Sequence, residues 1–130
     1  MSAGKYSFTI EQGSTLEFEI QYKDSNDIPI DLTSYNGRMQ VRPTIGSSDV
    51  YLTLSSSLQS DNTGLNFSGS NGSTPLSSGS IGIYVSAVTS SALNFTTAHY
   101  DLEIYSGSGN SAYVVRLLEG KVNLSKEVTR

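Results

Sequence analysis

One histidine, His99, is the side chain with the clearest capacity for acid–base chemistry, and Asp101 follows it two residues later. With many serines in the chain, a Ser-His-Asp triad can be written on paper. Residues two apart in a strand share a face, but no serine lies in a Gly-x-Ser-x-Gly turn between a strand and a helix. The Gly107-Ser108-Gly109 sequence belongs to an expected hairpin loop. We therefore predict no catalytic residue and no enzymatic activity.

Acidic side chains gather at Asp24-Ser25-Asn26-Asp27 and at Asp31, which raises the possibility of a calcium loop. An EF-hand loop that begins at Asp24 needs glycine at its sixth position and glutamate at its twelfth, where this chain has Pro29 and Tyr35. A looser oxygen cage and a solvated turn both remain open here. The absence of cysteine excludes disulfides and thiolate metal ligands. The glycine-serine runs lack the following lysine and helix of a phosphate loop, so we expect no metal and no cofactor.

Tyrosine supplies most of the aromatic content, since the chain has eight tyrosines and no tryptophan. Exposed tyrosines could contact a protein partner or stack on sugar rings, whereas half-buried ones would pack within a sheet. A straight row on one sheet would favour a glycan, and a larger apolar patch would favour a protein. The candidate contact residues are Tyr51, Tyr84, Tyr105 and Tyr113.

Charge is sparse, at 15% of residues with a net charge of -4, and the eight basic residues are scattered. Nucleic acids and anionic membranes require clustered lysine and arginine, so we expect neither as a partner. The sequence has no apolar run of the roughly 18 residues that a membrane-spanning helix needs. The segment that follows Met1 lacks the apolar stretch of a signal peptide, which predicts a protein made in the host cytoplasm and not secreted.

Apolar residues alternate with polar ones along much of the chain, as expected of strands with one face on a core. The clearest case is 15–22, where Leu16, Phe18, Ile20 and Tyr22 share one parity. The number of such runs predicts an all-β, antiparallel sandwich of about seven to nine short strands. Further strands are expected at 6–10, 37–42, 49–54, 65–67, 81–85, 100–105 and 113–124, with 28–33 as an edge or a connection.

The domain organisation follows from the same pattern: residues 1–130 form one domain, with a Ser/Gly-rich loop region around 55–80. A helical turn is plausible at 89–93, with Thr89 or Ser90 as its N-cap. In the last strand the inward set changes parity between Leu117 and Leu118, which predicts a β-bulge, with Gly120 available for a strained backbone angle.

Two stretches give the chain a family resemblance. The first combines Gly13 with a Pro-Ile-Asp-Leu-Thr corner at 29–33 and a strand that ends in Arg42. The second combines Tyr-Asp-Leu-Glu-Ile at 100–104 with Gly-Lys-Val-Asn-Leu-Ser-Lys-Glu-Val-Thr at 120–129. Together they resemble the N-terminal module of tailed-phage baseplate upper proteins over about two-thirds of the chain, although the Ser-rich middle departs from it. The resemblance implies an immunoglobulin-like sandwich that packs or attaches virion parts and carries no catalytic residues.

Tyr100 has the position of a tyrosine corner, so we expect it to pack in the core while its hydroxyl ties down the preceding turn. The predicted function is that of a non-enzymatic structural protein of a tailed bacteriophage virion, in the baseplate, tail or capsid decoration. It would act by protein–protein assembly with other virion proteins and with itself as a homo-oligomer, presenting a strand edge or an apolar face. The alternative is a carbohydrate-binding or adhesion module that recognises a host-surface glycan.

Overall fold

Strands make up nearly all of the regular structure in the computed structural model, which describes residues 4–69, 72–107 and 113–126. The helical segments are a 3-10 turn at Leu76–Ser78 and the short helix α1 (Ala87–Ser91). The strands are β1 (Gly4–Lys5), β2 (Phe8–Glu11), β3 (Leu16–Gln21), β4 (Asn36–Arg42), β5 (Leu52–Ser55), β6 (Gly64–Asn66), β7 (Ser80–Val85), β8 (Thr97–Ser106) and β9 (Tyr113–Ser125).

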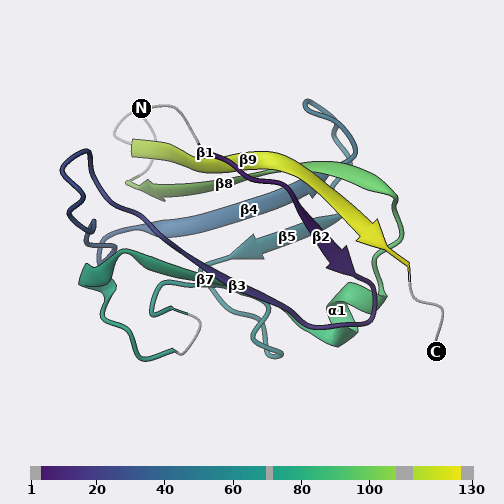
Figure 1. Cartoon of the computed structure of the whole chain (residues 1–130), viewed down its shortest axis with the longest axis horizontal. Coiled ribbons are helices and arrows are strands. Elements are labelled where there is room, and N and C mark those ends of the chain that lie inside the picture. The colour runs from purple at the N-terminus through teal and green to yellow at the C-terminus, as the bar shows by residue number, and fades with distance from the viewer. Residues whose placement is uncertain (1–3, 70–71, 108–112, 127–130) are drawn as a thin grey trace.

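The strands form two sheets that pack against each other (Figure 1). One sheet has the order β1-β9-β8-β4-β5, with β2 also paired to β9, and the other has the order β3-β7-β6. The orders β3-β7-β6 and β9-β8-β4-β5 correspond to B-E-D and G-F-C-C′ of an immunoglobulin domain. The structure therefore confirms the predicted all-β, immunoglobulin-like sandwich.

The N-terminal edge departs from the antiparallel expectation. Both β1 and β2 run parallel to β9, with Gly4 opposite Leu118 and Phe8 opposite Val122. The whole N-terminal segment thus joins the six-stranded sheet, and β3 is left as the outer strand of the three-stranded sheet.

The core lies between the sheets and is built from alternate residues of each strand. On β8 the inward side chains from Ala98 to Ile104 are buried, and the outward ones are half-buried or exposed, as the alternation predicts. In β7, the middle strand of its sheet, nearly every residue is buried. Each large apolar side chain removed from water stabilises the fold by about 1.5–3 kcal/mol. Fully buried examples are Leu54, Leu65, Ile81, Ile83, Leu102, Ile104 and Val122.

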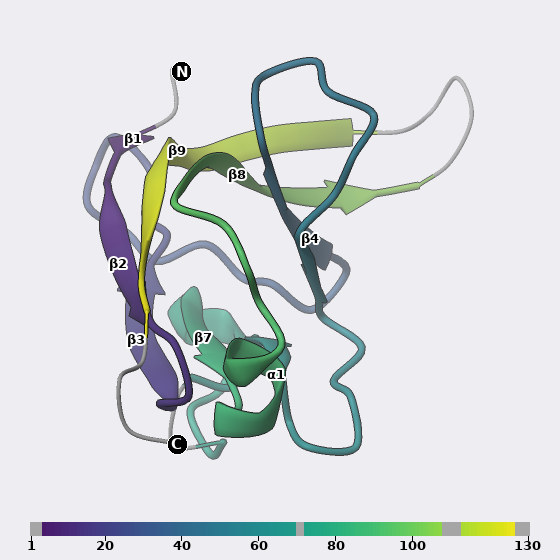
Figure 2. The same ribbon diagram turned by 90° about the vertical axis from the view of Figure 1, so that its right-hand side faces the viewer.

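The bulge predicted in the last strand is confirmed. Leu102 pairs with Leu118 and the next residue, Glu103, pairs with Arg116, so Leu117 is the extra residue. Bulges bend the strand that carries them. Figure 2 shows that β9 bends along its length, and its last part runs beside β2.

Gly120 is required for a reason other than the predicted backbone angle. It is absent from the positive-φ residues of the described chain, so it does not supply a strained angle. A Cβ atom at this position would instead collide with the backbone carbonyl of Tyr6. Glycine is needed because the N-terminal segment passes directly against the β9 backbone there.

Three local expectations were wrong. The N-cap of α1 is Ser86, whose side chain accepts a hydrogen bond from the Thr89 N–H, because the helix begins two residues earlier than predicted. Val50 lies within the strand expected at 49–54, but it is exposed and precedes the strand, because β5 begins only at Leu52. The Tyr100 hydroxyl donates to the carbonyl of Tyr6, 2.6 Å away, and not to the preceding turn.

The connecting segments also contribute to the core. The 28–33 stretch is a connection, as one of the two expectations had it, with an isolated bridge between Lys23 and Pro29 and with Leu32 fully buried. The Ser/Gly-rich region around 55–80 holds β6 and the buried Phe67. Gly69, Gly72 and Gly79 of this region have the positive φ angles that glycine readily adopts in turns. The predicted hairpin loop at 106–110 falls largely outside the described residues.

Candidate functional site

The side of the sandwich between the N-terminal edge and β3 is lined by aromatic and aliphatic side chains. Phe8 from β2 meets Phe18 from β3, with 5.3 Å between ring centroids, and Tyr6 lies 5.8 Å from Phe18. Tyr6 is 47% exposed, and the remaining members are only half-buried. We call this surface the lateral seam. It consists of Tyr6, Phe8, Phe18, Ile20 and Leu118.

The lateral seam exists because of the strand pairing. In β3 the inward residues remain half-buried, whereas the corresponding positions of β7 are fully buried. A neighbouring strand beyond β3 would cover them, but the N-terminal strands pair with β9 instead. The sequence pattern could identify these residues as inward-facing, but it could not show that one side of them stays open.

Toward β1, the seam opens into a groove of about 290 Å³. Its apolar wall comes from Ile20, Leu117 and Leu118, and its rim carries Lys23 and Arg116. A groove with apolar walls and a cationic rim can receive an apolar side chain whose neighbours are polar or acidic. The remaining lining residues are Gly4, Gln21 and Tyr22.

Tyr22 connects this groove to another aromatic group. Burial raises the pKa of Tyr22, and the neighbouring Tyr113 and Tyr35 raise that pKa further because of repulsion between phenolates. The rings of Tyr35 and Tyr113 lie 6.4 Å apart. Tyr22, Tyr35 and Tyr113 therefore lie near one another at this end of the sandwich.

A second surface is the outer face of the six-stranded sheet, where charged side chains form cross-strand rows. Asp101 and Glu119 face each other in one row, and Arg38, Glu103 and Arg116 form the next. Arg38 Nε donates to Glu103 at 2.9 Å, and Arg116 lies within 4 Å of three carboxylates. Such exposed ion pairs each contribute about 0–1 kcal/mol, so this network does not by itself explain the stability of the sheet.

Neighbouring groups shift the pKa values of two carboxyl groups on this face, Asp101 and Glu119. Burial raises the pKa of Asp101, and the nearby Glu103 carboxylate raises it further, while the Arg116 guanidinium opposes this rise. The Glu119 carboxyl behaves in the opposite way, because a hydrogen bond from the Lys5 ammonium, at 2.7 Å, lowers its pKa.

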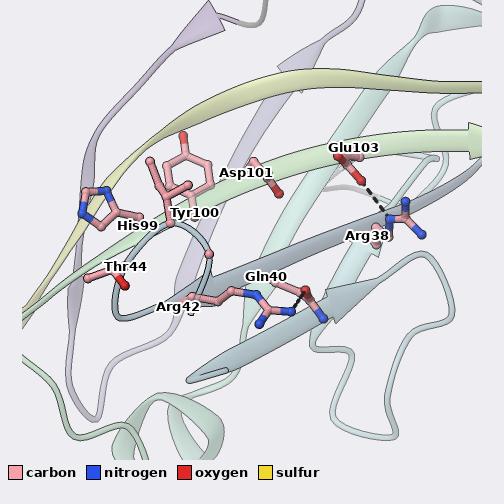
Figure 3. A pocket seen from close by; sticks show the side chains of 10 residues that line it. Arg38, Gln40, Arg42, Thr44, His99, Tyr100, Asp101 and Glu103 are labelled. Carbon is pink, nitrogen blue, oxygen red and sulfur yellow. Dashed lines mark hydrogen bonds and ion pairs between the residues drawn. The ribbon is translucent and has the colours of Figure 1, made fainter. Parts of the chain in front are cut away.

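The loop after β4 overhangs this face and encloses a groove of about 370 Å³ (Figure 3). His99 and Asp101 both line it, so the expectation that they share a face is correct. The described contacts include no hydrogen bond between them, and no serine lines the groove. Arg42 is held by neutral acceptors, the Ser47 carbonyl at 2.6 Å and the Gln40 amide oxygen at 2.7 Å. Ile45, at the overhang, is 88% exposed.

The four candidate tyrosines lie on separate surfaces. Tyr51 stacks on Phe95 near the start of β5, with 4.7 Å between centroids. Tyr84 lies on β7, in the three-stranded sheet, and Tyr105 lies under the Arg38 guanidinium at 4.7 Å. Tyr113, at the start of β9, is 56% exposed. They do not form one straight row.

The acidic loop at 24–31 uses its carboxylates to shape turns. Asp24 Oδ1 accepts hydrogen bonds from the backbone N–H groups of Asn26 and Ile28. Asp31 Oδ1 accepts from both the N–H and the hydroxyl of Thr33, and these bonds lower its pKa. Within the described ranges, no group of three or more acidic or histidine side chains is arranged to hold a metal ion.

A polar cluster that the sequence analysis missed joins the loop before β6 to α1. Asp61 Oδ2 accepts hydrogen bonds from the Ser86 hydroxyl at 2.6 Å and the Thr89 hydroxyl at 2.9 Å. Hydrogen bonds from Ser86 first, then from Thr63, hold the pKa of Asp61 well below its usual range. The spacing of Ser86 and Thr89 was the available signal, since an N-cap hydroxyl bonds to the third residue of its helix.

Comparison with known proteins does not identify a family for this chain. No protein-family model matches this chain, and a search of curated proteins finds no match. Among the residues that the structure describes, no helix is long and apolar enough to cross a membrane.

Proposed function

We propose that this protein is a non-enzymatic structural component of a tailed-bacteriophage virion that acts through protein–protein assembly. The observation that carries the proposal is the lateral seam, where Tyr6, Phe8 and Phe18 form one partly exposed aromatic surface. Clustered aromatic side chains are typical of the centres of protein interfaces. The resemblance to baseplate modules supplies the virion context.

The arrangement of the tyrosines supports assembly over glycan recognition. A flat sugar-binding platform needs several rings on one face, and Tyr51, Tyr84 and Tyr105 lie on different parts of the sandwich. The glycan-binding module thus remains the alternative, without an observation that favours it.

The first test is the solution mass of the full chain by light scattering across a dilution series. We expect either a concentration-dependent oligomer or, for a protein that assembles onto others, a monomer present in purified particles of the phage that encodes it. Two results together would contradict the proposal. The protein would be a monomer at every concentration, and mass spectrometry would not detect it in those particles.

A variant pair then assigns the contact to the seam. Tyr6→Ser removes an exposed ring of the lateral seam, and we expect it to weaken self-association or particle incorporation at least tenfold. The matched control is Val88→Ser, which removes a side chain that is 78% exposed on α1, far from the seam in sequence. Equal loss in both variants, with unchanged melting curves, would assign the contact elsewhere.

A further inference from the structure

We infer that Asn36 is a site of spontaneous deamidation that the fold keeps unreactive through a hydrogen bond from Gly37 to Ser56. Such a modification is separate from the proposed assembly function. Asparagine is a thermally labile residue. It is most labile before glycine, because no side chain then shields the backbone nitrogen that attacks it. Asn36-Gly37 is such a pair, and Asn71 of the chain's other Asn-Gly pair lies outside the described residues.

The reaction at Asn36 uses only the chain and water. The Gly37 backbone nitrogen attacks the side-chain carbonyl carbon of Asn36, and the new N–C bond closes a five-membered succinimide ring. The bond from that carbon to the side-chain nitrogen breaks, and ammonia leaves with the hydrogen of the Gly37 N–H. Water then opens the ring at either of its carbonyls, which gives aspartate or isoaspartate. The net change is the loss of one ammonia and the gain of one water.

Asn36 has the exposure that this reaction requires. It begins β4 with its side chain exposed, whereas Gly37 is buried. Water therefore reaches the side-chain amide in the folded chain. A larger residue does not fit in place of Gly37, because a Cβ atom there would lie 2.8 Å from Cζ of Phe67. Core packing thus requires glycine directly after Asn36, and with it the labile pair.

Ser56 holds the attacking nitrogen. The Gly37 N–H donates to Oγ of Ser56 at 3.0 Å, and the Ser56 N–H donates back to the Gly37 carbonyl at 3.0 Å. In a regular antiparallel pair, the backbone carbonyl of Ser56 would accept the first of these bonds. Because β5 ends at Ser55, the Ser56 hydroxyl takes that place. The Gly37 N–H must leave this acceptor before its nitrogen can lose the hydrogen and attack Asn36.

The pairing of β4 with β8 fixes the same backbone from the other side. Asn36 pairs with Tyr105, and Gly37 pairs with Ile104. Paired strand residues keep an extended backbone. The succinimide ring closes only when the Gly37 nitrogen turns toward the Asn36 side chain, which an extended backbone does not allow. Deamidation therefore requires a local opening at the start of β4, and the free energy of that opening sets its rate.

The test compares Asn36 in the full chain with the same residue in the isolated tryptic peptide Asp24–Arg38, where no fold protects it. Both are incubated in the same mildly alkaline buffer, and the full chain is digested afterwards. Mass spectrometry follows the conversion of amide to acid, with fragment ions that separate Asn36 from Asn26. We expect Asn36 to react at least about tenfold more slowly in the full chain, because only the open fraction reacts. Equal rates would overturn the inference.

A variant pair assigns the protection to Ser56. Ser56→Ala removes the acceptor, so Asn36 should react about two- to tenfold faster in folded protein, the change in an opening equilibrium that one hydrogen bond produces. Ser57→Ala is the matched control, because it removes an exposed hydroxyl from the next residue and leaves the bond to Ser56 Oγ in place. An unchanged rate in folded Ser56→Ala, or an equal increase in both variants, would overturn the assignment.

Amide hydrogen exchange at Gly37 in the wild type decides the case in which Ser56→Ala fails to fold. Urea added below the unfolding transition raises the population of locally open states. Deamidation of Asn36 and exchange at Gly37 should then rise together, since both require the Gly37 N–H to leave Ser56. Deamidation that stays constant while Gly37 exchange rises would overturn the inference.

Discussion

The hydroxyl of Tyr100 joins the two ends of the chain, and its removal is the sharpest test of how the N-terminal edge is held. Tyr100 is 5% exposed, and its hydroxyl donates to the Tyr6 carbonyl at 2.6 Å. Tyr100→Phe keeps the ring, which packs on Phe8 at 5.0 Å between centroids, and removes only this bond. The bond is only partly buried, so its removal should lower the free energy of unfolding by about 0.5–1.5 kcal/mol at pH 7, the usual net contribution of one hydrogen bond.

The same residue makes a prediction about alkaline pH. Burial, with a smaller contribution from Tyr6, raises the pKa of Tyr100 from 10.0 to about 12. Because the folded pKa lies above the unfolded one, the associated stability is complete below about pH 10 and is lost as pH rises toward 12. With about 1.4 kcal/mol for each pH unit, this loss reaches roughly 2–3 kcal/mol at most. Tyr100→Phe lacks a titrating group here and escapes that part of the loss.

The assay is urea unfolding of wild type and Tyr100→Phe at pH 7 and at pH 11.5, analysed as a difference in the free energy of unfolding. Subtraction of the variant isolates Tyr100 from the other tyrosines, including Tyr22, whose pKa is also raised. The stability gap should narrow at the higher pH. Tyr105→Phe, on the outer face, is the control and should change little. A variant as stable as wild type at pH 7, with a gap that does not depend on pH, would refute the reasoning.

Two further substitutions test local packing. Gly120→Ala places a Cβ atom against the Tyr6 carbonyl, so the N-terminal segment must shift. By analogy with overpacked cores, we expect the free energy of unfolding, measured with urea, to fall by about 1–3 kcal/mol. An unchanged free energy of unfolding would contradict the close approach. Asp61→Asn weakens the hydrogen bonds from Ser86 and Thr89 and should lower the urea midpoint at pH 7. Because the pKa of Asp61 is lowered in the folded state, its contribution to stability is complete above about pH 4 and falls with acidification. The difference in the free energy of unfolding between wild type and Asp61→Asn should therefore be smaller at pH 3 than at pH 7. A difference that does not change with pH would count against the cluster.

The alternation of side chains predicted much of this fold because a half-buried strand imposes period two on its own sequence. That local rule located β3, β7 and β8, and the parity change at Leu117 and Leu118 located the bulge. It could not predict that β1 and β2 run parallel to β9, since strand partners are chosen by contacts between residues more than a hundred positions apart.

The candidate site depended on this non-local choice. The sequence identified Phe18 and Ile20 as inward-facing, but only the pairing of the N-terminal strands with β9 shows that one side of them stays open. Gly120 is similar: its position near the bulge was noticed, while its reason, the passing Tyr6 carbonyl, lies at the other end of the chain. For Tyr51, Tyr84, Tyr105 and Tyr113, residue type alone could not tell one surface from several.

Tyr6 connects the stability of the fold to the surface that we propose for assembly. Its backbone is fixed by the Tyr100 hydroxyl and by the Glu119 carbonyl, which accepts from the Tyr6 N–H at 3.0 Å, while its ring lies on the lateral seam beside Phe18. A change that releases this backbone should therefore disturb the seam before it unfolds the sandwich. Tyr100→Phe and Gly120→Ala should weaken assembly at temperatures where they remain folded. Asp61→Asn changes the cluster at Ser86 and Thr89 and leaves both hydrogen bonds of the Tyr6 backbone in place, so it should not.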